Sequence, residues 1–459
     1  MPNFVNKPVL IKANSSANRD FSLCPSDYRD FMYDYEGVFL IDLLDKKKTG
    51  QEIGSNAYIK NAKYKFLKTR NINFNYLVDK EFTESCGNAN AVKPFPNSIF
   101  IAKDGGGAGL GDVGFYDINQ YDGNDFISSG ILNIVPKKEN LFYVLAILKY
   151  VHFKNFIDTY TKKGSTIRHS KKLALEYKVP YSDSISNQIT EISDLMKKIV
   201  NNEITIRNQT TKINQIINNE LNLSNYTTTK AKNTISSLKS NNCRMDSGMY
   251  SDSFAQMEEC LKKYNHGCFT LPIDEIKSGN TPKERFISEK SKYVWVTPTD
   301  IQTNGLLNYT SNITMNGSNN INNDCLLIIN RGDKYDVGIS MFYDHSYFKN
   351  GHHNQGIYRV DCYDKQTLIS MSAYLNSTFC RKLCSYLSYG TKMREMKSVD
   401  FSKLLFPKFP SEIQKQIFEL YTSEDGILTL GNENIELKIK INALLDSLYN
   451  KALSKENNK

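Results

Sequence analysis

Residues 185–221, ISNQITEISDLMKKIVNNEITIRNQTTKINQIINNEL, carry the strongest structural signal in this chain. The stretch contains neither glycine nor proline, and isoleucine recurs every seven residues, at Ile185, Ile192, Ile199, Ile206 and Ile213. A seven-residue apolar repeat is typical of a helix that packs one stripe of side chains against a partner helix. At 1.5 Å per residue the helix would be roughly 55 Å long. Asn, Gln, Thr, Lys and Glu flank the stripe, so the stretch is not a membrane span.

A partner helix is predicted near the C-terminus, where a second stripe with the same spacing occurs. Its members are Ile413, Leu420, Ile427, Ile441 and Leu448. Asn434 breaks this stripe, and Gly426 and Gly431 interrupt the helix. We expect the two stripes to form the contact, here called the helix-pair seam, between two long antiparallel helices. The alternative is that each helix packs on its own globular domain.

Composition favours a multidomain protein with an anionic partner. The chain has 459 residues, enough for two to four domains. Its net charge of +9 suits a polyanion. Nine scattered cysteines without a CxxC pair predict reduced thiols, with neither a disulfide framework nor a metal site. Without a signal-peptide pattern or a run of 18 apolar residues, we expect a cytoplasmic protein that does not enter a membrane.

Segments of the first half recur in the second half in the same order. The clearest pairs are Phe66–Ile72 with Val294–Ile301, Ile99–Gly114 with Leu326–Gly338, Lys163–Ser165 with Tyr389–Thr391, and Ile185–Ile192 with Ile413–Leu420. The offset between the copies is nearly constant and equals about half of the length of the chain. Two further pairs are Arg19–Phe31 with Arg244–Phe254 and Lys48–Gly50 with Ile276–Pro282. Six matches at a near-constant offset indicate an internal duplication of about half of the chain.

The repeat predicts an α+β architecture. Short apolar runs alternate with turn signals in both halves, which indicates two β-rich domains separated by the two long, coiled-coil-like helices. The expected segments are 1–35, completing the C-terminal half; 36–160, the first β-rich domain; 161–245, the central spacer helix region; 246–388, the second β-rich domain; and 389–459, the C-terminal spacer helix region.

This arrangement resembles the specificity (S, or HsdS) subunit of type I restriction–modification systems over nearly the whole chain. The resemblance rests on the strand and turn at 269–282 and on the helix starts at Ile185 and Ile413, which follow Pro180 and Pro407. In that family the β-rich domains are target-recognition domains, and the helices are a spacer that docks methyltransferase subunits. About 35 residues precede the first turn motif, which departs from the commonest family pattern.

The resemblance implies a non-catalytic chain that recognises a bipartite, asymmetric target in double-stranded DNA. Two methyltransferase (M) subunits would bind S-adenosylmethionine and methylate adenine, and restriction/translocase (R) subunits could join them in phage defence. Spacer helices of roughly 50 Å would separate the half-site centres by about 15 base pairs. Three alternatives remain: the recognition subunit of a type IIB/IIG-like system with a fused methylase–nuclease partner, a coiled-coil scaffold for proteins only, and an enzyme.

Motifs for chemistry within the chain are weak. An adenine methyltransferase needs an [ND]-P-P-[YF] loop for the flipped base, and the sequence contains no Pro-Pro. Gly109, Gly111 and Gly114 form a GxGxxG pattern, but the following residues predict a strand, whereas a nucleotide site needs a helix there. We therefore interpret the segment as a loop that faces DNA or as a plain hairpin turn. His352 and His353 are adjacent, so they cannot bind one metal from a strand. We expect them on the surface, or alternatively as groups that contact bases.

DNA binding requires cations for phosphates and polar groups for base edges. The candidates lie in the loops that recur in both halves: Lys68, Arg70, Lys103, Arg168, Thr297, Thr299, Arg331, Lys334 and Arg394. Arg168 and Arg394 rank first because both halves carry the same residue at that position. They would contact phosphates or, alternatively, grip a carboxylate where domain meets helix. Asp300 is interpreted as a turn residue that caps its own backbone.

Overall fold

The computed structural model describes residues 36–59, 62–72, 76–81, 83–87, 91–106, 109–120, 123–161, 167–223, 247–281, 294–307, 320–348, 351–391 and 393–454. The predicted N-terminal segment 1–35 therefore lies outside the described residues. The chain forms two compact units. Unit 1 extends to Glu203 and resumes at Glu436, and unit 2 is Ile204–Ile435. No described helix combines the length and the apolar composition that crossing a bilayer requires.

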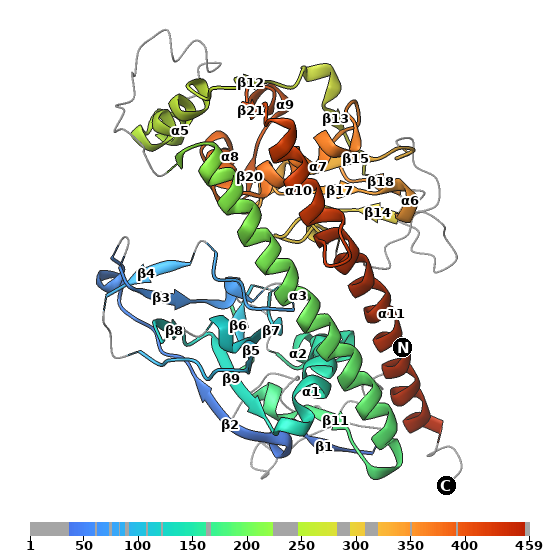
Figure 1. Ribbon diagram of the computed structural model, residues 1–459. Coiled ribbons are helices and arrows are strands. Elements are labelled where there is room, and N and C mark those ends of the chain that lie inside the picture. The colour runs from blue at the N-terminus through green and yellow to red at the C-terminus, as the bar shows by residue number, and fades with distance from the viewer. Residues whose placement is uncertain are drawn as a thin grey trace. The chain divides into compact units, whose positions relative to one another are not determined.

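Unit 1 is a β-rich body with short helices, drawn from blue to green in Figure 1. Its strands are β1 (Gly37–Phe39), β2 (Leu44–Thr49), β3 (Tyr64–Leu67), β4 (Glu84–Cys86), β5 (Ser98–Ala102), β6 (Asp104–Gly105), β7 (Val113–Tyr116), β8 (Asp125–Ile127), β9 (Ile131–Pro136), β10 (Arg168–His169) and β11 (Lys178–Pro180). Its helices include α1 (Leu141–Lys149), α2 (Val151–Tyr160) and the start of α3 (Ser186–Glu220).

The main sheet of unit 1 is antiparallel, in the order β2-β9-β5-β7. The central strand β5 has the sequence SIFIA and is buried along its whole length, as expected for a strand covered on both faces. Helix α1 packs on β7 and β9. A smaller sheet, β4-β3-β8, contains a parallel pair, and β6 with β10 forms a separate two-stranded ribbon.

Unit 2 contains a corresponding set of elements. Its strands are β12 (Cys268–Phe269), β13 (Lys277–Ser278), β14 (Val294–Val296), β15 (Cys325–Ile329), β16 (Arg331–Gly332), β17 (Ser340–Tyr343), β18 (Gly351–His353), β19 (Ile357–Val360), β20 (Arg394–Glu395) and β21 (Phe406–Pro407). Its helices include the end of α3, α5 (Asp252–Lys262), α6 (His345–Phe348), α7 (Lys365–Asn376), α8 (Thr378–Leu387), α9 (Ser398–Phe401), α10 (Ser411–Thr422) and the start of α11 (Ile427–Ser454).

The main sheet of unit 2 is antiparallel in the order β13-β19-β15-β17, and α7 packs on β15 and β17. The parallel pair is β14 with β18, and the ribbon is β16 with β20. The central strand β15, CLLII, is buried throughout. Across both main sheets the strands lie in the same order: the first along the chain, then the fourth, the second and the third.

The predicted long helix is confirmed as α3, which runs unbroken for 35 residues. Its first part belongs to unit 1 and the remainder to unit 2. Helix α11 is divided in the opposite order, starting in unit 2 and ending in unit 1. Figure 1 draws α3 in green and α11 in red. The predicted five-segment division treats these helices as segments of their own, whereas each compact unit contains a part of both.

The residues predicted for the helix-pair seam differ in burial. Seven are buried: Ile192, Ile199, Ile206, Ile213, Ile427, Ile441 and Leu448. Ile185, Ile413 and Leu420 are half-buried. In α10 the buried residues are Ile417 and Tyr421. Tyr421 lies one residue after Leu420, the position that the heptad pattern predicted to be buried. In unit 2, Ile206, Ile213 and Ile217 of α3 share one apolar cluster with Ile417 and Ile427.

The two glycines of the C-terminal helix behave differently. Helix α10 ends at Thr422 and α11 begins at Ile427, so the interruption lies at Gly426. A Cβ on Gly426 would lie 2.6 Å from the Tyr421 carbonyl oxygen, which leaves no room for a side chain. Gly431 lies inside α11, where its bare backbone packs against Leu306. Gly431 therefore allows close packing without breaking the helix.

Within unit 1, aromatic residues fasten the end of α11 to the β-rich body. The Tyr150 hydroxyl donates a hydrogen bond to the Asp446 carboxylate. The hydroxyls of Tyr177 and Tyr449 lie 2.8 Å apart. The Tyr449 ring also stacks on His152, with ring centres 4.3 Å apart. This end of α11 is therefore held by specific polar and aromatic contacts as well as by its apolar stripe.

Candidate nucleic-acid interface

Each unit carries a two-stranded ribbon beside its glycine-containing loop. In unit 1, Arg168 is paired with Gly105 and His169 with Asp104. In unit 2, Arg394 is paired with Gly332 and Glu395 with Arg331. The loop glycines Gly111 and Gly338 have φ values of +80° and +96°, a conformation that favours glycine. Strand β7 follows the first loop, as predicted, so the GxGxxG pattern does not open a helix.

The ribbons are attached to their units by equivalent backbone hydrogen bonds. The Lys103 amide donates to the Gly130 carbonyl and the Ser170 amide to the Lys103 carbonyl, at 2.9 and 2.7 Å. In unit 2 the Asn330 amide donates to Gly356 and the Met396 amide to Asn330, both at 2.9 Å. Backbone bonds of this kind fix where the side chains of the ribbon point, whatever those side chains are.

Arg168 and Arg394 are engaged within their own units. Arg168 donates from Nη1 to Asp158 Oδ1 at 2.5 Å and from Nη2 to the Asp158 carbonyl at 2.9 Å. Only 11% of the Arg168 side chain is exposed. Arg394 donates from Nη2 to the Ser388 carbonyl at 2.6 Å. For Arg168 the geometry favours the predicted alternative, in which the arginine binds a carboxylate instead of a phosphate. Arg394 binds a backbone carbonyl instead of a carboxylate.

The other cations of the ribbons occupy three environments. Lys103 lies 3.3 Å from Asp104 and is largely covered. Arg331 Nη2 donates to Glu395 Oε1 at 2.9 Å, and 41% of its side chain is exposed. Lys334 Nζ lies 5.0 Å from the centre of the Tyr335 ring. Of the three, Arg331 and Lys334 are the better placed to meet a ligand.

Lys68 directly precedes a short 3₁₀ turn of unit 1, Thr69–Asn71, and Arg70 lies within it. Lys68 Nζ lies 2.5 Å from Glu84 Oε2, and Arg70 Nη2 lies 3.5 Å from Glu84 Oε1. Although burial lowers it, the Glu84 carboxylate and the Tyr58 hydroxyl raise the pKa of Lys68 above its ordinary value. The pair shares one carboxylate, so the turn keeps a net positive charge.

The matching turn in unit 2, Pro298–Asp300, is closed by a capping box. The Thr297 amide and hydroxyl both donate to Asp300 Oδ2, at 2.8 and 2.6 Å, which confirms the structural role predicted for Asp300. The hydroxyls of Thr297 and Thr299 lie 2.8 Å apart. In unit 1 the Lys68 amide donates to Asn71 Oδ1 at 2.7 Å, so an amide replaces the carboxylate there.

The expectation that His352 and His353 lie on the surface is wrong. Both belong to β18, and they are only 5% and 1% exposed. Burial, reinforced by the charge of Arg359, lowers the pKa of His353 to about 4. An imidazole is polar, which suggested the surface, yet strand β18 pairs with β14 inside unit 2. These histidines are not available to bases or phosphates.

Sequence reasoning missed two exposed apolar residues that directly precede the ribbon strands β10 and β20. Ile167 and Met393, directly before the two arginines, are 56% and 64% exposed. Lys171 and Lys397, three residues after the arginines, are exposed as well. Among the described residues neither lysine forms an ion pair. The sequence signal for all four residues was their equal spacing from Arg168 and Arg394 in the two units. A search for charged residues alone does not find Ile167 and Met393, because these two are apolar.

A further cationic surface in unit 1 lies on the edge strand β2. Lys48 Nζ is 3.6 Å and Lys46 Nζ 5.9 Å from the centre of the Phe95 ring. Burial and then the charge of Lys46 lower the pKa of Lys48. Lysines also protect sheet edges from pairing with other chains, which accounts for them without a ligand.

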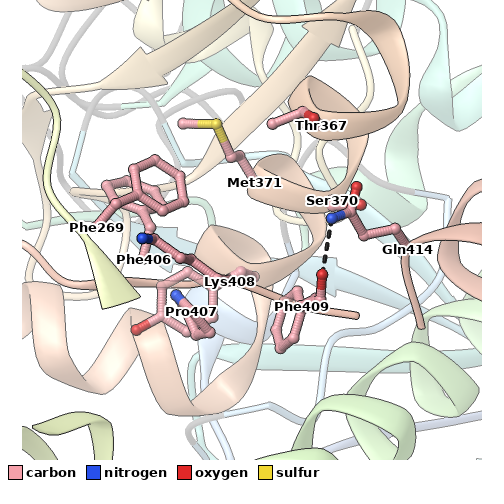
Figure 2. A pocket seen from close by; sticks show the side chains of 10 residues that line it. Phe269, Thr367, Ser370, Met371, Phe406, Pro407, Lys408, Phe409 and Gln414 are labelled. Atoms are coloured by element: carbon pink, nitrogen blue, oxygen red, sulfur yellow. Dashed lines mark hydrogen bonds between the residues drawn. The ribbon is translucent and has the colours of Figure 1, made fainter. Parts of the chain in front are cut away.

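Figure 2 shows a pocket of unit 2 between β12, β21, α7 and the start of α10. Phe269, Met371, Phe406 and Lys408 line it, and Gln414 Nε2 donates to the Phe409 carbonyl at 2.8 Å. Its volume is about 130 Å³. Sites for cofactors and drug-sized ligands usually measure about 300 Å³ or more, so this pocket is too small for one. The described residues also contain no group of three or more His, Cys, Asp or Glu side chains placed to bind a metal.

Three solved structures that are similar to the chain are from type I restriction–modification systems. They include the S subunit from M. genitalium, with 14% identity, a TM-score of 0.35 and coverage of 92% of this chain and 97% of that one. The HsdS subunit from Thermoanaerobacter tengcongensis has 10% identity, a TM-score of 0.28 and coverage of 91% and 96%. A third concerns complex assembly and conformational transition of the type I R-M system, with 11% identity, a TM-score of 0.28 and coverage of 91% and 97%.

No protein-family model and no curated protein matches the chain.

Proposed function

We propose that the chain is the DNA-recognition (specificity) subunit of a type I restriction–modification complex. Its two units are the target-recognition domains, each recognising one half of a split, asymmetric site in double-stranded DNA. The helices α3, α10 and α11 dock two methyltransferase subunits. Those partners bind S-adenosylmethionine and methylate adenine, restriction subunits can join the complex, and the chain itself supplies no catalytic group.

The observation that carries this proposal is the repetition of one strand order in two compact units. The orders β2-β9-β5-β7 and β13-β19-β15-β17 match strand for strand. A parallel pair and a two-stranded ribbon accompany each sheet. Together with the near-constant sequence offset, this supports an internal duplication. Two similar domains with different loops are what a protein needs to recognise two different half-sites.

Close approaches at glycines repeat as well. A Cβ on Gly50 would lie 2.1 Å from the Ser128 carbonyl oxygen, and one on Gly279 would lie 2.2 Å from that of Asn354. Both glycines directly follow the edge strand of their main sheet. A shared steric requirement at matching positions supports common descent of the units more strongly than a shared strand count does, because many unrelated sheets have four strands.

The test is DNA binding by the intact complex. The full chain is copurified with the methyltransferase encoded beside it, and binding to duplex DNA is measured between 50 and 200 mM salt. We expect log K to fall linearly with log salt, because counterions leave the phosphates, and we expect a footprint of two separated stretches. Absent or salt-independent binding by the complex would overturn the proposal and favour a scaffold for proteins.

A further inference from the structure

We propose that the ribbons β6–β10 and β16–β20 contact DNA base edges. Each ribbon has one polar cross-strand pair, and we propose that the difference between these two pairs causes the two units to recognise different half-site sequences. This inference rests on the proposed function and names the specificity-determining residues within it. They are Asp104 with His169 in unit 1 and Arg331 with Glu395 in unit 2. The apolar tips Ile167 and Met393 and the cations Lys171 and Lys397 complete the two surfaces.

Both ribbons expose an apolar side chain at the same position. Large apolar residues are usually covered, yet Ile167 and Met393 are 56% and 64% exposed. Isolated exposed apolar residues are common, but the same position in both units makes chance a weaker explanation. In DNA grooves such side chains contact the thymine methyl group or wedge against base steps.

The charge around the apolar tips favours DNA as the partner. Lys171 and Lys397 are exposed and lie four residues beyond the tips. Protein–protein interface cores are depleted of lysine, whereas DNA phosphates attract it. Lys171 has a φ of +51°, an uncommon backbone conformation for a lysine, which sets the direction in which its side chain leaves the loop. An apolar tip with a nearby exposed cation therefore suits a duplex better than a protein partner.

A rigid support lies beneath each ribbon surface. Arg168 is hydrogen-bonded to Asp158, and Arg394 to the Ser388 carbonyl. These bonds fix the start of each ribbon strand, directly after the exposed apolar residue. The backbone bonds to Lys103 and Asn330 fix the same strand at its far end. Base recognition requires such support, because each contact must form within a few tenths of an ångström.

The carboxylate of the cross-strand pair lies on opposite strands in the two ribbons. In unit 1 the carboxylate, Asp104, lies on the loop-side strand, and His169 Nδ1 is 3.0 Å from Asp104 Oδ1. In unit 2 the loop-side strand carries Arg331, and the carboxylate Glu395 comes from the partner strand. In unit 1 His169 is the more exposed member, at 60% of its side chain against 18% for Asp104. In unit 2 Arg331 and Glu395 are similarly exposed, at 41% and 36%.

The side chains of Arg331 and His169 recognise bases differently. A guanidinium can donate two hydrogen bonds to O6 and N7 of guanine in the major groove, whereas an imidazole offers one group at a time. Glu395 would orient Arg331, and Asp104 would orient His169. One architecture thus presents two different polar groups at equivalent points, as an asymmetric target demands.

The test is methylation mapping with the full complex, comparing the wild type with Arg331→Ala and His169→Ala. We expect Arg331→Ala to relax one position in one half-site, with discrimination falling roughly tenfold or more. His169→Ala should relax a position in the other half-site only. The matched control is Lys365→Ala, since Lys365 is also 41% exposed and lies 3.1 Å from Asp344, away from the ribbon. It should leave the motif unchanged.

Folding is checked by copurification with the methyltransferase and by the fluorescence of Trp295. Arg331→Lys keeps the charge but loses the two-pronged donor, so it should also relax the motif while preserving affinity. A wild-type motif in both Arg331 variants and in His169→Ala would overturn the inference and leave the proposed function standing. Relaxation of both half-sites by one variant would overturn it as well. A wild-type complex without any chain-dependent motif would overturn the proposed function and this inference together.

Discussion

At the scale of single residues, identity in the two units does not mean equal contacts. Arg168 and Arg394 occupy the same position in the two ribbons, yet one guanidinium binds a carboxylate and the other a backbone carbonyl. Each is oriented inward, and the exposed cations are Lys171 and Lys397. The repeated arginine predicted a phosphate contact, but both guanidinium groups bind groups of their own unit, so we propose Lys171 and Lys397 for that contact instead.

Replacing Lys171 with Ala is therefore expected to change DNA binding differently from replacing Arg168. Lys171→Ala should flatten the slope of log K against log salt by about 0.9, because one phosphate contact is lost. Arg168→Ala should leave the slope unchanged and reduce the stability of unit 1 instead, because the two hydrogen bonds from Arg168 to Asp158 are lost. Salt titrations of the two variant complexes measure both slopes; a flattened slope for Arg168→Ala alone would contradict this assignment.

His353 predicts a pH dependence of folding in unit 2. Its pKa is about 4 in the folded chain because of burial, against about 6.5 when unfolded. Stability is fully present above about pH 6.5 and decreases as the pH falls, by up to about 1.4 kcal/mol per unit, because only the unfolded chain takes up the proton. The decrease should end near pH 4.

The comparison variant is His353→Ile, because Ile127 occupies the corresponding position in the parallel pair of unit 1. Urea unfolding at pH 7, 6 and 5, followed by the single tryptophan Trp295 in β14, should show a shallower decrease for this variant than for the wild type. Equal pH dependence in the two chains would show that His353 is not the responsible group.

At the scale of elements, the heptad periodicity of the sequence predicts a helix well where local sequence alone determines it. The heptad isoleucines of α3 specify a helix without help from distant residues, and α3 runs from Ser186 to Glu220 as expected. The second helix is less regular: it is interrupted between Thr422 and Ile427, where the Tyr421 carbonyl oxygen leaves no room for a side chain on Gly426. The buried pair Ile417 and Tyr421 lies off the expected heptad because α10 packs on α7, which the heptad rule does not consider.

Ile206 tests the buried face of α3 within unit 2. It is 1% exposed and belongs to the main apolar cluster of the unit. Ile206→Asp should lower the free energy of unfolding by at least about 4 kcal/mol or abolish folding, because it buries an unpaired charge. Asn208→Asp, at an exposed position of the same helix, should change it by less than about 0.5 kcal/mol. Denaturant unfolding monitored at Trp295 compares them; similar stability for both would remove Ile206 from the buried face.

At the scale of the whole molecule, the sequence repeat predicted two similar bodies, and the described strands form two sheets of matching order. The candidate site was less predictable. Asp104 pairs with His169, and Arg331 with Glu395, across strands that are well separated in the chain, and no local pattern marks such a pair. Burial of His353 likewise depends on strand β14, which belongs to a distant segment of the sequence.

Genome-wide methylation mapping gives the clearest check of the DNA-recognition role. It compares a host that expresses the chain with its neighbouring methyltransferase against a host that lacks only this chain. We predict a split, asymmetric motif with methylated adenines that appears only when the chain is present. An identical methylation pattern in both hosts, with the complex assembled and the methyltransferase active, would show that the chain does not select the target.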